Sequence, residues 1–217
     1  MFNVLPNVVQ KGLGAKSLMY ETHDAGRHKP LDRRVRRTRQ AIKSSLLALM
    51  KEKSLQEITV KEVMEHADVN RATFYAHFSN LEDLVKSIET DMAEQVIQTA
   101  ERSLRENAST PDRVFFAFDE VLANREICQW LTGEQSTGYG KKLICDYARE
   151  RFVPELMSRN GLERQEALYV FDYLYNGSFG MLARWCAAET DEERGQAKLI
   201  IRRVITATFV EIEAQRG

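Results

Sequence analysis

The stretch TVKEVMEHADVNRATFYAHF, residues 59–78, reads as two short helices joined by a tight turn. Thr59 and Glu62 have the spacing of a capping box, which predicts a helix that begins at Val60. The Asp-Val-Asn that follows this helix interrupts its period, because Asp and Asn favour turns and caps over helix interiors. A short helix, a tight turn and a second short helix are typical of a helix-turn-helix that reads DNA.

The second of these helices has two chemically different faces. Phe74 and Phe78 are four residues apart, so they share one face and are predicted to be buried. Arg71, Ala72 and Tyr75 are predicted to lie outside. Because a guanidinium can pair with O6 and N7 of guanine in the major groove, Arg71 is the strongest candidate for reading the base sequence.

Charge is distributed unevenly along the chain. Residues 27–86 contain 13 Lys or Arg against 8 Asp or Glu, residues 87–217 contain 16 against 22, and the whole chain has a net charge of −1. Such a separation suits a protein that lays one end on a polyphosphate, since phosphate contacts supply most non-specific affinity. The densest basic block is Lys29, Arg33, Arg34, Arg36, Arg37 and Arg39. A block of this kind is often a solvated helix start or a flexible tail, but its place directly before the helix-turn-helix favours DNA contact.

The most specific motif ends the helix-turn-helix. Residues 73–78 read TFYAHF and residues 82–84 read EDL. A Thr, an apolar residue, Tyr, any residue, His and Phe, followed shortly by an acidic-acidic-Leu helix start, resembles the most recognisable string of TetR/AcrR-type (tetracycline-repressor-like) transcription regulators. The resemblance covers residues 36–89, where a first helix over 38–50 would pack across the helix-turn-helix. It implies an N-terminal three-helix DNA-binding domain.

The resemblance also implies roles for individual residues. Tyr75 and His77 would offer their polar tips to phosphate oxygens, although both could instead cap and pack the small domain. Thr38, at the start of the first helix, and Thr73 would contact the DNA backbone through a hydroxyl or a helix N-terminus. The predicted DNA-binding residues are Arg33, Arg34, Arg36, Arg37, Thr38, Thr59, Asn70, Arg71, Ala72, Thr73, Tyr75 and His77.

Two positions depart from the family pattern. The turn carries Asp68 where the family usually has Gly, and Asp tolerates a left-handed backbone better than most residues. Leu81 stands where the family commonly has a Lys that meets a phosphate, so one phosphate contact per subunit is expected to be missing. A purely protein-binding role, with DNA reading lost, is the alternative that Leu81 raises.

The composition favours an all-α protein. The 217 residues are 43% hydrophobic and include only four prolines. We expect about nine helices, which form an N-terminal helix-turn-helix domain and a C-terminal helical ligand-binding and dimerisation domain. Residues 1–30 are predicted to be a flexible extension, residues 31–80 the DNA-binding domain and residues 81–217 the regulatory and dimerisation domain. No apolar run has the length of a signal peptide or a membrane span, which predicts a cytoplasmic protein without a membrane partner.

The sequence predicts neither an enzyme nor a bound cofactor or metal. Glu62 and His66 are four apart on a helix, but no third metal ligand accompanies them. Neither a phosphate-cradling Gly loop nor a nucleophile elbow is found. The three widely spaced cysteines, Cys128, Cys145 and Cys186, predict reduced thiols, and no constellation supports a redox-sensing role.

The last two predicted helices, about 164–188 and 192–215, carry more apolar surface than one core needs. The final helix has one stripe with Ile201 and Ile205 and another with Ile200 and Val204. One stripe can face its own core and the surplus needs a partner, unless both are satisfied inside one monomer. In TetR-like proteins this pair forms a four-helix bundle with its twin, which implies a homodimer. The predicted interface residues are Phe171, Tyr175, Ser178, Ile201, Ile205, Thr208, Phe209 and Ile212.

A homodimer would read a palindromic operator in double-stranded DNA, with half-sites roughly 34–36 Å apart. In the family, a small molecule in the second domain changes the separation of the reading heads, which implies a repressor released by an unidentified effector. The candidate ligand-binding residues are Phe115, Phe118, Trp130, Tyr147, Tyr173, Asn176, Phe179 and Trp185, with core packing as the alternative for each. Residues 173–185 also loosely resemble regulators of dihydroxyacetone kinase operons. Some of those are activators that work with a partner protein, and this is the alternative function.

Overall fold

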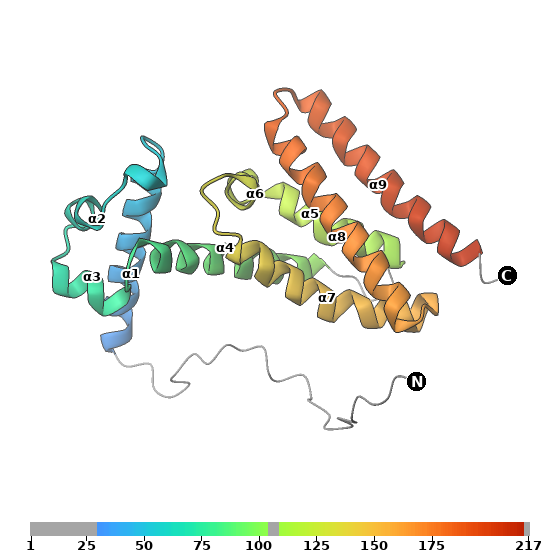
Figure 1. Ribbon diagram of the computed structural model, residues 1–217, viewed down its shortest axis with the longest axis horizontal. Coiled ribbons are helices and arrows are strands. Elements are labelled where there is room, and N and C mark those ends of the chain that lie inside the picture. The colour runs from blue at the N-terminus through green and yellow to red at the C-terminus, as the bar shows by residue number, and fades with distance from the viewer. Residues whose placement is uncertain (1–29, 104–108, 215–217) are drawn as a thin grey trace, which may run out of the picture. The chain divides into compact units, whose positions relative to one another are not determined.

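The computed structural model describes residues 30–103 and 109–214, and these ranges form nine α-helices and one short 3-10 helix, with no strand (Figure 1). The elements are α1 Pro30–Leu49, η1 Leu55–Glu57, α2 Val60–His66, α3 Arg71–His77, α4 Leu81–Ser103, α5 Thr110–Ala123, α6 Arg125–Thr132, α7 Tyr139–Asn160, α8 Arg164–Ala187 and α9 Asp191–Ala214. The predicted all-α fold is confirmed.

The chain divides into two units after Gln40, and the described part of the first unit is the beginning of α1, which ends in the second unit. The predicted flexible extension lies outside the described residues except for Pro30, which begins α1. Proline is favourable at the first helical position, because the N–H that it lacks would have no partner there. The arginines predicted to contact DNA are all exposed on this first part of α1: Arg33, Arg34, Arg36 and Arg37.

Within the second unit, the end of α1, helices α2 and α3 and the first turns of α4 share one apolar core. Its fully buried members include Ile42, Leu46, Val63, Phe74, Phe78, Leu84 and Val85, and Trp130 of α6 packs against the same cluster. The buried Lys43 joins α1 to α4, since its Nζ donates to the Ser87 carbonyl at 3.1 Å and to Asp91 Oδ2 at 2.6 Å. These contacts hold the helix-turn-helix on a rigid base.

Two further cores fill the rest of the second unit. One lies among α4, α6, α7 and α8 and includes Ala93, Val96 and Leu182. The other lies among α5, α7, α8 and α9, where α8 and α9 run side by side as an antiparallel hairpin (Figure 1). Helix α4 therefore contributes to two cores, with its first turns in the core of the helix-turn-helix and its later turns in the next.

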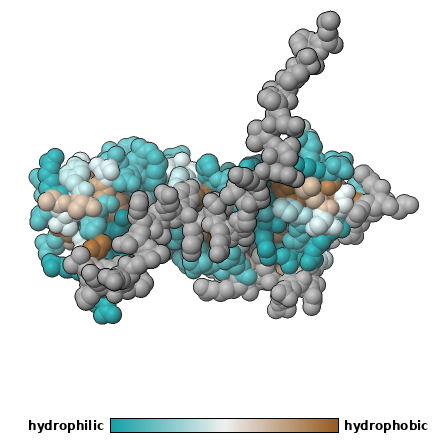
Figure 2. All heavy atoms as spheres, turned by 90° about the horizontal axis from the view of Figure 1, so that it is seen from below, coloured by the Kyte–Doolittle hydropathy of each residue, from teal (hydrophilic) through white to brown (hydrophobic). Residues whose placement is uncertain are grey.

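The surface is mostly polar on the face drawn in Figure 2, where hydrophobic side chains show only in small groups. None of the described helices is long and apolar enough to cross a membrane.

Candidate nucleic-acid interface and internal cavity

The turn between α2 and α3 is built by the residues that the sequence singled out. Helix α2 begins at Val60, and the Thr59 and Glu62 side chains form the predicted capping box. Asp68 has a φ of 50°, the left-handed conformation for which the family usually supplies Gly. Asn70 then caps α3, because its Oδ1 accepts a hydrogen bond from the Thr73 N–H at 2.8 Å.

Helix α3 presents a polar face to solvent. Phe74 is fully buried beneath it, whereas Arg71 and Ala72 are exposed and Tyr75 is 46% exposed. The Arg71 guanidinium lies over the Tyr75 ring at 5.4 Å from its centroid, one helical turn away. This stacking holds the arginine on the outer face, in a geometry that leaves its edge available for hydrogen bonds.

Tyr75 and His77, offered above as phosphate contacts, have different surroundings. Tyr75 lies on the open face beside Arg71, so core packing does not account for it. The His77 side chain is half-buried, and its ring lies 6.3 Å from that of Phe78. The packing alternative therefore fits His77 better than Tyr75.

Thr59 carries a negative neighbour. Its N–H and its hydroxyl donate to Glu62 Oε2 at 2.8 and 2.9 Å, and the same carboxylate pairs with Lys53. The hydrogen bond from Lys53, followed by those from Thr59, lowers the pKa of Glu62 to about 2. Both hydrogen-bond donors of Thr59 are thus engaged by this carboxylate, so Thr59 is a weaker candidate for a phosphate contact than the sequence suggested.

Thr38 is not at the start of its helix, which corrects the basis of its predicted role. Helix α1 begins eight positions earlier, at Pro30. The N–H groups of a helix are open only in its first turn, so those near Thr38 are engaged within α1. Its hydroxyl also donates to the Arg34 carbonyl at 3.0 Å.

The start of α4 is closed by its own side chains. Asn80 Oδ1 accepts from the Asp83 N–H, and Asp83 Oδ2 accepts from the Ser79 N–H, both at 2.8 Å. The half-buried Leu81 packs against the core of the helix-turn-helix. Because the start of α4 carries an aspartate and has Leu81 where a lysine would bind phosphate, we expect it to stabilise the helix and not to bind a phosphate.

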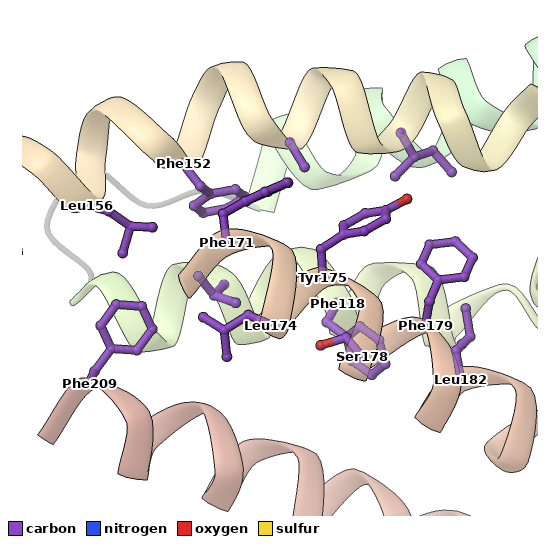
Figure 3. Close-up of a pocket in the computed structure, with 13 residues that line it drawn as sticks. Phe118, Phe152, Leu156, Phe171, Leu174, Tyr175, Ser178, Phe179, Leu182 and Phe209 are labelled. Carbon is purple, nitrogen blue, oxygen red and sulfur yellow. The ribbon is translucent and has the colours of Figure 1, made fainter. Parts of the chain in front are cut away.

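An apolar cavity of about 100 Å³ lies among α5, α7, α8 and α9 (Figure 3). Its lining residues are Val114, Phe118, Ile144, Ala148, Phe152, Leu156, Phe171, Leu174, Tyr175, Ser178, Phe179, Leu182 and Phe209. Of the eight candidate ligand-binding residues, Phe118 and Phe179 line it. Four residues predicted for the dimer interface also line it, namely Phe171, Tyr175, Ser178 and Phe209.

The other six candidate ligand-binding residues do not line this cavity, and their role in ligand binding stays a prediction. Tyr173 is 65% exposed and Asn176 is exposed, both on the outer face of α8. Trp130 belongs to the core of the helix-turn-helix, Trp185 packs against the core around α6 and Phe115 is buried in the core around α9. Tyr147 donates its hydroxyl to Glu101 Oε1 at 3.1 Å, and burial together with this bond raises its pKa to about 12.

The structure also reverses the two stripes of α9. Ile201 and Ile205, predicted to face a twin, are 1% and 2% exposed in the core of their own chain, and Phe209 is buried with them. Ile212 packs against the same core, and Thr208 donates its hydroxyl to the Val204 carbonyl. The stripe that faces outward is the other one, with Leu199, Ile200, Val204 and Val210. Hydrophobic periodicity marks both stripes and does not say which one is inside.

Helix α8 also has an exposed face, with aromatic and small residues. Tyr169 and Tyr173 are exposed, and Gly177 and Gly180 follow on the same side of the helix. A Cβ added at either glycine would meet nothing within 4 Å. The two glycines therefore do not serve a close crossing inside this chain.

Sequence reasoning missed a buried carboxylate, Glu89 of α4. It is 0% exposed and accepts four hydrogen bonds from the loop before α7 and from the start of that helix. The donors are the Ser136 hydroxyl at 2.8 Å, the Thr137 N–H at 2.7 Å, the Thr137 hydroxyl at 2.5 Å and the Gly140 N–H at 3.1 Å. Burial alone would raise the pKa of Glu89, but these hydrogen bonds outweigh it and hold the pKa below its ordinary value.

Close packing accompanies these hydrogen bonds. A Cβ on Gly140 would lie 3.0 Å from the Glu89 carbonyl oxygen, a tight contact, so glycine favours the close approach of α7 to α4. The partners of Glu89 are 47 to 51 positions away in sequence, and no local pattern announces them.

The three thiols are not poised for redox chemistry. Cys128 and Cys186 are buried, and Cys145 is half-buried. Burial raises the pKa of all three, that of Cys128 to about 12. Thiols that stay protonated near neutral pH are poor nucleophiles, and a sensing role has no support here.

Comparison with known proteins finds a family model that matches part of the chain and solved structures of similar fold. The family model described as bacterial regulatory proteins, tetR family, matches residues 44–88. An uncharacterised HTH-type transcriptional regulator, YxbF of Bacillus subtilis (strain 168), is 36% identical over 63 residues, which cover 29% of this chain and 17% of that protein. The chain thus spans less than a fifth of that relative's length.

Solved structures of similar fold cover most of the chain. A putative TetR-family transcriptional regulator from Syntrophomonas wolfei str. Goettingen has a TM-score of 0.64 at 17% identity, over 81% of this chain and 96% of that one. The fatty acid degradation regulator FadR from Bacillus halodurans has a TM-score of 0.61 at 14% identity, over 83% of this chain and 96% of that one. At these identities the likeness shows the fold alone.

Proposed function

We propose that this chain, which matches the tetR family model over residues 44–88, is a DNA-binding transcriptional regulator of that family, that it represses transcription as a homodimer on a palindromic operator and that a small-molecule effector releases it. The observation that carries the proposal is the exposed face of α3, where Arg71, Ala72 and Tyr75 project from a helix anchored by Phe74. A regulator of this kind acts by equilibrium binding. Because its ligand is DNA, we expect it to act in the cytoplasm.

Reading of bases is assigned to Arg71. The major groove of B-DNA admits an α-helix, and guanine offers O6 and N7 there to a guanidinium. The exposed Arg71, which rests on the ring of Tyr75, can present its edge in this way. Ala72 has only a methyl group, which allows α3 to approach the bases closely.

Substitution of Arg71 tests this role. Arg71→Ala should cost ~1–3 kcal/mol of operator affinity and relax the preference at one position of each half-site. Arg71→Lys is the matched variant, since it keeps the charge but loses the two-pronged hydrogen bond. Binding to operators with every base at each position would measure both effects. Unchanged base selectivity in Arg71→Ala would refute the assignment.

Phosphate binding is assigned to the exposed arginines of α1, which include Arg33 and Arg34. Counterions released from DNA make such binding depend steeply on salt, with a slope in log affinity against log salt of about −0.9 per phosphate. Replacing Arg33 and Arg34 by Ala should make that slope shallower by about 2 units. Replacing the exposed Arg151 and Arg164 of α7 and α8 is the control and should leave it unchanged. A slope near zero for the unaltered protein would support the protein-binding alternative instead.

The homodimer is assigned to the outer faces of α8 and α9. Ile200 and Val204 of α9 remain 49% and 40% exposed, and Tyr173 of α8 is 65% exposed. Contiguous apolar side chains of this kind are costly in water and mark an interaction surface. Gly177 and Gly180, with open space above them, would let a helix of the twin approach closely. A twin also supplies the second α3 that a palindrome requires.

Release by an effector is assigned to the apolar cavity. A ligand shifts the balance between two conformations only if it binds one of them better. The cavity is bounded by four helices, including α7, which contacts α4 through Gly140 and Glu89. Because α4 also helps to form the core beneath α3, movement of α7 can reach the DNA-reading helix.

A further inference from the structure

We infer that the apolar cavity among α5, α7, α8 and α9 selects neutral, apolar molecules over charged ones. Its role as the effector site rests on the function proposed above, whereas its ligand chemistry follows from the walls alone. The argument uses the composition of the walls, the groups that could meet a polar atom, the position of the nearest cations and the size of the space.

The walls carry almost no polar chemistry. Among the lining side chains, only Tyr175 and Ser178 bear a polar atom, and none bears a charge (Figure 3). An ion that entered would leave its hydration shell and find no opposite charge in exchange. Such a transfer is strongly unfavourable, so a carboxylate or an ammonium group is excluded.

The hydrogen-bonding capacity of the cavity is small. The Tyr175 hydroxyl donates to the carbonyl of Lys141 at 2.8 Å, so its proton is already engaged outside the cavity wall. Burial raises the pKa of Tyr175, which keeps this phenol neutral. Ser178, three residues after Tyr175 on α8, adds one hydroxyl to the cavity wall (Figure 3). A ligand with one hydroxyl or carbonyl oxygen can be satisfied here, but one with several polar groups cannot.

Cations lie near the cavity but do not line it. The Lys141 Nζ lies 4.6 Å from the centroid of the Phe179 ring, and the Arg149 guanidinium lies 5.5 Å from that of Phe171. Arg149 also pairs with Asp172 at 3.1 Å. Neither cation lines the cavity: Lys141 and Arg149 lie against the rings of Phe179 and Phe171, and Arg149 is also paired with a carboxylate.

The size of the cavity suits one small ring. Its volume is about 100 Å³. An engineered apolar cavity of about 150 Å³ in another protein stays empty of water and binds benzene, because water needs polar partners that such a space lacks. Toluene is one methyl group larger than benzene, so the wall must move outward to admit it as a probe.

The decisive experiment compares toluene with its anionic counterpart benzoate on the full-length protein. Toluene at about ten times its Kd should raise Tm by about 3–6 °C, and benzoate should bind at least about tenfold more weakly. Ser178→Leu, which fills the space, should abolish the toluene shift, whereas Ser178→Ala, which keeps the space and removes only the hydroxyl, should retain it. Calorimetric titration of the same variants measures the Kd values directly.

Three outcomes would overturn the inference about the cavity. If benzoate binds within about tenfold of toluene, the selection for neutral molecules is wrong. If neither binds, or if Ser178→Leu binds toluene as the unaltered protein does, the cavity is not the site. Operator affinity measured with and without toluene reports separately on release. Binding of toluene without any effect on operator affinity would uphold the site and contradict its proposed role in regulation.

Discussion

Replacing both Ile200 and Val204 by Glu should convert the dimer into monomers and lower operator affinity by at least ~100-fold. Both side chains lie on the outward stripe of α9 and are about half exposed in the single chain. In a two-fold interface each glutamate would meet its own copy or an apolar surface, which combines like-charge repulsion with the loss of hydration. Because one α3 contacts only one half-site, a monomer loses most of its operator affinity.

The measurement is the molar mass in solution, for example by sedimentation, together with operator binding by the same samples. Met157→Glu on α7 is the control, since Met157 is also an exposed apolar residue but lies off this face. Ile201→Glu makes a second contrast. This neighbour is buried in the core of its own chain and should unfold the protein rather than separate two copies. A dimer that survives both glutamates would move the interface to another surface.

Replacing Glu89 by Gln should lower the free energy of unfolding by about 2–4 kcal/mol at pH 7. The carboxylate accepts four hydrogen bonds in a site without solvent, and an amide would place donors against donors. Glu94→Gln is the matched control, because Glu94 lies on the same helix and is exposed. Urea unfolding of the three proteins measures the difference, and a loss below about 0.5 kcal/mol would contradict the assigned role.

The same substitution has a signature in pH. Folding holds the pKa of Glu89 below its ordinary value. The ionised carboxylate therefore stabilises the fold when the pH is above that ordinary pKa. This contribution is lost as pH falls through the folded-state pKa. The unaltered protein should therefore lose more stability than Glu89→Gln on acidification, and the two unfolding curves should converge at low pH. Parallel curves would show that the glutamate titrates alike in both states.

The helix-turn-helix could be predicted from sequence because its signals are local. The capping box of Thr59, the turn at Asp68 and the cap of Asn70 each involve residues within four positions of one another. The start of α1 was missed, although Pro30 followed by a helix-compatible run is a recognised beginning. The dense arginines before Thr38 indicate a basic surface, but the same segment also continues the helix back to Pro30.

The features that could not be predicted depend on contacts between distant segments. Both stripes of α9 have helical spacing, and only the packing of Ile201 against α5, α7 and α8 decides which is buried. The sequence marks the aromatic residues of α5 and α8 as candidates, but it does not reveal that Phe118 and Phe179 share a cavity while Tyr173 faces solvent. Glu89 resembles any other glutamate in a charged helix until its partners from the segment before α7 are in place.

Helix α4 has a consequence for attempts to isolate the DNA-reading part of this protein. A fragment that ended at residue 80 would lack Leu84, Val85 and Ile88, all fully or nearly fully buried against α1 and α3, and also Trp130. It would expose Phe74 and Phe78 to water and should aggregate or remain unfolded. A peptide of residues 30–103 restores these residues of α4, still lacks Trp130, and should keep α3 closer to its present shape than the fragment that ends at residue 80.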